Sequence, residues 1–242
     1  MPQLFCYISI DTDFTIMNFK KLTKLLTLQF VAVSLFAQSA NTGNWVAYFG
    51  NQAFNKKWNL HSEIQYRSYN FIGDTQQLLL RTGLGYNFSE KNNNLLLGYG
   101  FINTQNYVAN TDEKVDFDEH RIFQQFITRQ NFGRIFTQHR YRTEQRFYND
   151  SFRFRFRYFL GINIPVTQKT MASKAVYLSM SDEVFINAKS NVFDRNRLYG
   201  GLGYVINKNL RVELGYMSQM LENSKRGQLQ ILLFNNIPFH KN

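Results

Sequence analysis

Apolar and polar residues alternate along most of this chain. In the stretch "SFRFRFRYF", residues 151 to 159, aromatic side chains alternate with Arg153, Arg155 and Arg157. Side chains of a β-strand point alternately to the two faces of the sheet, so this stretch predicts a strand with one aromatic and one cationic face. The two faces of this strand must therefore lie in different environments, one apolar and one polar.

The same period of two recurs elsewhere. Leu78, Leu80 and Leu84, for example, share one face of their segment, and Arg81 lies on the other. We predict eleven such segments, at 44–53, 57–72, 76–88, 94–107, 119–132, 134–148, 151–164, 175–187, 196–206, 209–220 and 227–239. Most have about 11 to 16 residues, whereas strands of soluble domains cluster at about five or six. This length suits a tilted crossing of a lipid bilayer, which takes about 9 to 11 residues.

Aromatic and basic residues are distributed as a membrane-spanning sheet requires. Many of the 24 Phe, 14 Tyr and 2 Trp lie near the ends of predicted strands, and aromatic rims are typical of transmembrane β-barrels. All arginines except Arg195 and Arg226 fall inside predicted strands, whereas the lysines after residue 37 fall in turns or at strand margins. An arginine that faces lipid at the midplane costs about 2–4 kcal/mol, so the strand arginines are predicted to point inward.

These features predict an all-β fold, an antiparallel up-and-down transmembrane β-barrel of 10 to 12 strands. The alternative is a periplasmic β-sandwich with a core of aromatic residues, although its strands should be shorter. Connections at 55–57, 89–94, 133, 166–174 and 207–209 are predicted at one end, and longer or acidic ones around 108–118, 188–195 and 221–226 at the other. Because bacterial barrels have even strand numbers, ten or twelve strands are expected. Segment 44–53 is then either a lead-in or paired with a missed strand.

The N-terminal region resembles an export signal. Three lysines precede an apolar run that ends at Ala37, which is the layout of a secretory signal peptide. We interpret 1–16 as sequence upstream of the true start, 17–37 as the signal peptide and 38–242 as the barrel. Cleavage removes Cys6, three lysines and two aspartates, so the exported chain forms no disulfide and its net charge falls from +11 to +10. The predicted location is the outer membrane, with its lipid as a partner; export argues against nucleic acid as a partner, despite the pI of about 9.7.

The inward faces supply the candidate functional residues. Arginines predicted to line the lumen and contact anions are Arg67, Arg81, Arg140, Arg142, Arg146, Arg153, Arg155, Arg157 and Arg211. The predicted counter-charges are Glu63, Glu144, Glu183 and Glu213. Arginine rings favour anions, so one prediction is a narrow channel for small anionic solutes. The alternative is a closed barrel, filled by a hydrogen-bonded network, with a structural or surface-interaction role.

Little in the sequence points to catalysis. It has no HExxH, P-loop or GxSxG motif, and we predict no enzyme, catalytic residue, metal ligand or cofactor. His61 and Glu63 share a strand face, so an outer-membrane hydrolase is a further alternative. The acidic stretch 108–119 has enough carboxylates for calcium, but it lacks the glycine and spacing of an EF-hand and is predicted to be a solvated loop.

Four stretches resemble one family. They are the export junction "SLFAQ", the opening "NWVAYFGNQAFNKKWNLHSEIQYRSY", the strand "HRYRTEQRF" and the terminal "GQLQILLFNNIPF". Together they resemble an uncharacterised family of outer-membrane β-barrel proteins of Bacteroidota. The resemblance implies the fold, the location and contact with the outer-membrane assembly machinery during insertion, but no established activity.

Overall fold

The computed structural model describes residues 42–71, 73–89, 92–149, 151–189 and 191–239. The predicted signal peptide and the stretch before it lie outside the described residues. Eleven strands make up the fold: β1 (Thr42–Ala53), β2 (Trp58–Ser68), β3 (Thr75–Ser89), β4 (Asn93–Tyr107), β5 (Lys114–Phe132), β6 (Ile135–Tyr148), β7 (Ser151–Pro165), β8 (Val176–Asn187), β9 (Phe193–Asn207), β10 (Leu210–Met220) and β11 (Lys225–Asn235). Among the described residues, no helix is long and apolar enough to cross a membrane.

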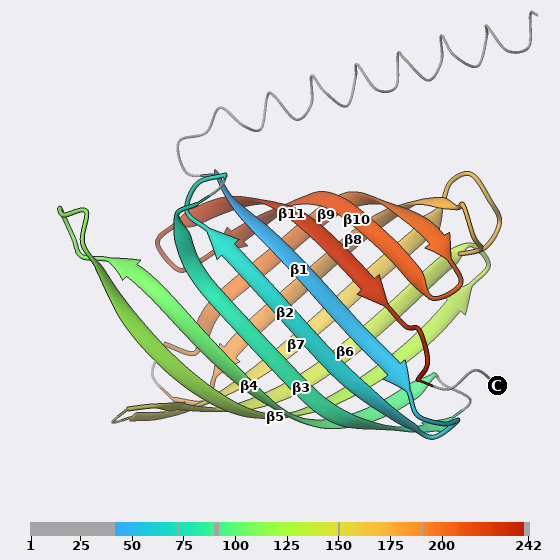
Figure 1. Cartoon of the computed structure of the whole chain (residues 1–242), viewed down its shortest axis with the longest axis horizontal. Helices are drawn as coiled ribbons and strands as arrows, with labels where there is room; N and C mark the ends of the chain where they lie inside the picture. The colour runs from blue at the N-terminus through green and yellow to red at the C-terminus, as the bar shows by residue number, and fades with distance from the viewer. Residues whose placement is uncertain (1–41, 72, 90–91, 150, 190, 240–242) are drawn as a thin grey trace, which may run out of the picture. The chain divides into compact units, whose positions relative to one another are not determined.

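The strands form a closed barrel in which sequence neighbours pair antiparallel (Figure 1). Closure joins the first strand to the last, and this pair is parallel, from Thr42 opposite Gly227 to Gly50 opposite Asn235. The predicted all-β barrel is confirmed, and eleven strands lie within the range of 10 to 12. The expectation of an even number was wrong, because segment 44–53, the odd one in that count, is the full strand β1 and closes the barrel without a further strand.

Residue alternation places apolar side chains outside and most charged side chains inside. Ile64, Leu84 and Leu97 on the outer face are 50%, 49% and 60% exposed. Arg155 and Arg157 are buried inside, while Phe156 between them is 49% exposed on the outer surface. The two faces predicted for "SFRFRFRYF" are therefore the two faces of β7.

The connections are grouped at two ends, as predicted. The β1–β2, β3–β4, β5–β6, β7–β8 and β9–β10 connections share the end that we call the Gly133 end; the others share the Asp74 end. Gly133 begins a two-residue hairpin turn with φ of +60°, a conformation that glycine adopts without a steric penalty. Loop length does not separate the two ends, because residues 166–175, the longest connection, lie at the Gly133 end.

The acidic stretch 108–119 is only partly a loop. β5 begins at Lys114, so the second half of this stretch belongs to the β4–β5 hairpin, which projects past the neighbouring connections in Figure 1. Its Lys114 Nζ forms an ion pair with Asp74 in the β2–β3 connection and donates to the carbonyl oxygen of Thr75 at 2.8 Å. These contacts fasten two adjacent connections to each other at the Asp74 end.

Candidate functional site in the barrel interior

A cavity of about 920 Å³ lies inside the barrel, and all eleven strands contribute to its lining. An eight-stranded barrel has room only for its side chains, so the additional strands account for this space. Asn55 and Asn209 line it from the Gly133 end, and Asn106 and Arg226 from the Asp74 end. Among the described residues, thirteen arginines and three glutamates line the cavity, so its wall is strongly cationic.

Glu144 on β6 is the centre of the charged wall. Its side chain is fully buried, and the register places it opposite Arg155 of β7. Arg155 donates to Glu144 Oε2 from Nη2 at 2.6 Å and from Nε at 3.1 Å, and Arg157 Nη1 donates to Oε1 at 2.6 Å. Three more guanidinium nitrogens lie 3.6, 3.7 and 3.8 Å from this carboxylate, those of Arg81, Arg142 and Arg121.

Two further buried glutamates extend these ion pairs to neighbouring strands. Arg81 Nη1 donates to Glu63 Oε1 at 2.7 Å. Arg140 Nη2 and Arg157 Nη2 each donate to Glu183 Oε1 at 2.7 Å. A buried charge is costly unless it is paired, so each contact offsets part of the desolvation of both partners.

Glu119 is the fourth carboxylate, and sequence reasoning assigned it to the acidic loop. It is instead buried in β5, where Arg121 Nε donates to Oε1 at 2.6 Å and Arg146 Nε to the same oxygen at 2.5 Å. We call the connected set the arginine–glutamate network; it comprises Arg81, Arg121, Arg140, Arg142, Arg146, Arg155 and Arg157 with Glu63, Glu119, Glu144 and Glu183.

The remaining predicted charges are placed differently. Arg153 is exposed at the start of β7, where its guanidinium carbon lies 5.5 Å from the ring of Tyr148. Arg211 lines the cavity but lies 3.7 Å from Glu213, longer than a hydrogen bond. Glu213 accepts its shorter contact, 2.8 Å, from the hydroxyl of Tyr177. Glu213 is therefore paired more closely with a tyrosine than with an arginine.

Several lining residues were missed by sequence reasoning. Arg195 and Arg226, expected outside strands, belong to β9 and β11, and both line the cavity together with Arg121, Arg129 and Arg197. Arg134, expected inside a strand, lies in the Gly133 turn, where it donates to the carbonyl oxygen of Pro165 at 2.7 Å.

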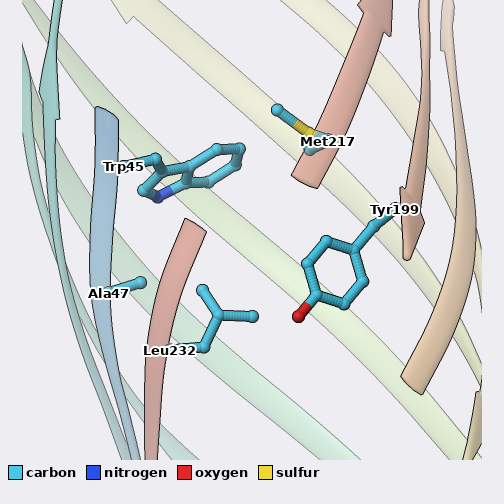
Figure 2. Close-up of a cluster of buried hydrophobic side chains, with 5 residues drawn as sticks. All are labelled: Trp45, Ala47, Tyr199, Met217 and Leu232. Carbon is cyan, nitrogen blue, oxygen red and sulfur yellow. The ribbon is translucent and has the colours of Figure 1, made fainter. Parts of the chain in front are cut away.

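An apolar cluster inside the barrel was also missed. Figure 2 shows side chains of β1, β9, β10 and β11 that converge on the interior: Trp45, Ala47, Tyr199, Met217 and Leu232. The partly buried Phe49 and Phe234 pack against this cluster, their rings stacked at 5.1 Å. The lumen thus has a charged wall centred on β6 and β7, and on β1 and β9–β11 it has an apolar cluster that lies among further lining arginines.

The candidate acid–base pair is close but already engaged. His61 Nε2 lies 3.2 Å from Glu63 Oε2, as their shared face predicted, while the other oxygen of Glu63 accepts from Arg81. Within the described part of the chain, no group of three or more His, Cys, Asp or Glu residues is arranged to hold a metal ion.

Fold and site together define the class: a closed eleven-stranded β-barrel with a buried arginine–glutamate network. The chain belongs to the family described as "Protein of unknown function (DUF2490)", whose model matches residues 42–230 and so extends from β1 into β11. No curated protein matches the chain. No solved structure matches it either.

Proposed function

We propose that this protein is an integral outer-membrane barrel, without enzymatic activity, whose lumen is a narrow channel favouring small anionic solutes. Its other partners in this proposal are outer-membrane lipid and, during insertion, the outer-membrane assembly machinery; nucleic acid is not one. The observation that carries the proposal is the excess of arginine around a cavity that has lining residues at both barrel ends. Over the described ranges, the lining has thirteen arginines and three glutamates, and the carboxylates number six when Glu144, Glu213 and Asp194, which pair with lining arginines, are added.

The outer surface supports membrane insertion. Large apolar side chains are exposed on strands all around the barrel, among them Ile64, Leu84, Leu97, Phe156 and Leu198. Soluble monomers rarely expose contiguous apolar patches beyond a few hundred Å², because such surface is unfavourable in water. Lipid tails would cover this surface, while the arginines stay away from hydrocarbon on the inner face.

Anion preference follows from the sign of the lining. A narrow, low-dielectric passage lined by unbalanced positive charge attracts anions and repels cations. Arg140 and Arg211 are the most direct candidates, since their side chains are 17% and 30% exposed within the cavity wall. Either guanidinium can meet a solute without dismantling the ion pairs of Glu144.

The test is a conductance measurement on refolded protein in a planar lipid bilayer under a salt gradient. We expect discrete channels whose reversal potential has the sign of anion selectivity. The double variant Arg140→Gln, Arg211→Gln should move that potential toward zero. Lys169→Gln, which removes the same charge from an exposed turn, should change it little. Electrically silent bilayers or a cation-selective potential would overturn the proposal.

A closed barrel with a structural or surface-interaction role is the second candidate. It is favoured by the arginine–glutamate network, whose fully buried centre, Glu144, has five arginines within 4 Å. Such a network fills space inside a barrel and resists displacement. Silence of both the wild type and the double variant in the same bilayers would favour this candidate.

A further inference from the structure

Two buried arginines of the lumen lie outside the arginine–glutamate network. Arg67 and Arg197 are 9% and 8% exposed, and neither has a carboxylate within salt-bridge distance among the described residues. Arg67 Nη2 donates to Gln65 Oε1 at 3.1 Å, and Arg197 Nε to Gln219 Oε1 at 2.9 Å. Both acceptors are neutral, so two buried guanidinium groups here have no directly bonded carboxylate.

Glu183 offsets the charge of Arg197 only in part. The two residues are opposite each other in the β8–β9 register. However, Glu183 Oε1 accepts hydrogen bonds from Arg140 and Arg157, at 2.7 Å each. Arg197 has no direct bond to this carboxylate, so its guanidinium can still attract a bound anion.

The ring of Trp45 brings the two arginines together. The guanidinium carbon of Arg67 lies 3.7 Å from the ring centroid, and that of Arg197 lies 5.1 Å from it. Two donors at this place, Trp45 Nε1 and Arg67 Nε, are buried without a hydrogen-bond partner in the described structure. Buried N–H groups are paired in most proteins, so two unpaired donors beside two guanidinium groups that bond to no carboxylate indicate an anion site.

The surroundings of this site are apolar. Trp45 belongs to the cluster in Figure 2, together with Leu232 on the adjacent strand β11, Met217 on β10 and Tyr199 on β9. Trp45, Tyr199, Met217 and Leu232 all line the 920 Å³ cavity. A ligand anchored at the arginines would therefore bring the rest of its surface against aromatic and aliphatic side chains.

We propose that Trp45, Arg67 and Arg197 form a subsite of the lumen for an organic anion that carries an aromatic or short aliphatic group next to its carboxylate. Guanidinium groups bind the planar carboxylate through paired hydrogen bonds, and the apolar cluster receives the group attached to it. The inference names a solute class for the proposed channel and rests on that function for a route into the lumen.

The chain offers an optical probe for this subsite. Its two tryptophans are Trp45 and Trp58, and Trp58 is 42% exposed near the Gly133 end. In the Trp58→Phe variant, refolded in a nonionic detergent, Trp45 reports binding by its fluorescence. The probes are benzoate, the neutral isostere benzamide, and acetate, which has the charge but almost no apolar group.

We expect benzoate to change the fluorescence of Trp45 saturably, and benzamide and acetate to bind at least about tenfold more weakly. Arg67→Gln and Arg197→Gln should each weaken benzoate binding by about tenfold to a hundredfold, the range for a hydrogen bond to a charged group. Arg67→Lys, which keeps the positive charge but loses the paired guanidinium donors, should weaken benzoate binding less. Lys169→Gln, in the exposed β7–β8 connection, is the matched control and should stay within about twofold.

Each contrary result would show which part of the inference is wrong. Equal binding of benzamide would show that charge is not recognised, and equal binding of acetate that the apolar wall is not used; either overturns the inference. Absence of saturation by benzoate in a folded barrel, with folding checked by heat-modifiable gel migration, overturns it as well. If the protein conducts anions but does not bind benzoate, the channel proposal holds and the subsite is refuted. If it binds benzoate but gives no conductance in bilayers, the channel is refuted and the subsite holds.

Discussion

Replacement of Glu144 by Gln tests whether the arginine–glutamate network holds the barrel together. Glutamine keeps one acceptor oxygen and places an NH₂ group where the other oxygen was. In one orientation the NH₂ group faces Arg155 and two hydrogen bonds are lost; in the other it faces Arg157 and one is lost. Each hydrogen bond to a charged group contributes about 1.5–3 kcal/mol.

Loss of the negative charge adds to this cost. Five guanidinium groups within 4 Å of Glu144 lose their shared counter-charge, at a position where the Glu144 side chain is fully buried. Removing one partner from a buried ion pair destabilises proteins by about 3–5 kcal/mol. We expect a loss in this range, a large fraction of the about 5–15 kcal/mol by which a typical domain is stable.

Urea unfolding in lipid vesicles, followed by tryptophan fluorescence, measures this loss as a lower midpoint at an unchanged slope. Glu222→Gln is the matched control, because Glu222 lies exposed in the β10–β11 connection and its replacement should change stability by no more than about 0.5 kcal/mol. If Glu144→Gln were as stable as this control, the network would not be a source of stability and the argument from buried charge would be refuted.

Two further predictions concern a connection and a glycine. Desolvation raises the pKa of Asp74, but hydrogen bonds, among them the one from Lys114, outweigh it and hold the pKa below its ordinary value. The contact with Lys114 is therefore fully formed above about pH 4, and it is lost as the pH falls through the lowered pKa. Hydrogen exchange should show the Asp74 end loosening at low pH in the wild type and not in Asp74→Asn. Gly203→Ala would place a Cβ atom 2.0 Å from the ring of Tyr177, and urea unfolding should show a loss of stability of about 1–3 kcal/mol. Gly200→Ala in the same strand is the control, because its Cβ atom would meet nothing within 4 Å. Equal stability of the two variants would contradict the packing argument.

The barrel and its inward-facing arginines could be predicted from sequence. Alternation of apolar and polar residues is a local signal, and arginine identifies the face that points into the lumen. Arg155 and Arg157 lie between aromatic residues, so their face followed directly. Arg121 carried the same signal, because it shares one strand face with Glu119 and Gln125. All three side chains are buried in β5. Arg121 was placed in a predicted strand but was not named among the arginines of the lumen, and Glu119 was assigned to the acidic loop.

Other features have no local signal. Leu79 and Leu96 point inward but stand in runs of three leucines, in which alternation cannot distinguish the two faces. The parallel pairing of β1 with β11 joins segments from opposite ends of the fold, and no turn connects them. The place of segment 44–53 in the sheet was left open, and the contact of Trp45 with Arg67 was not predicted.

The central claim is that the charge of the lumen selects anions, and an opposed pair of variants tests it most directly. Arg140→Gln removes a positive charge from the cavity wall, and Glu183→Gln removes a negative charge from the residue to which Arg140 donates at 2.7 Å. Under the same salt gradient, we predict that the reversal potential moves toward cation preference in the first variant and toward stronger anion preference in the second. Shifts in the same direction, or none in either, would contradict the claim.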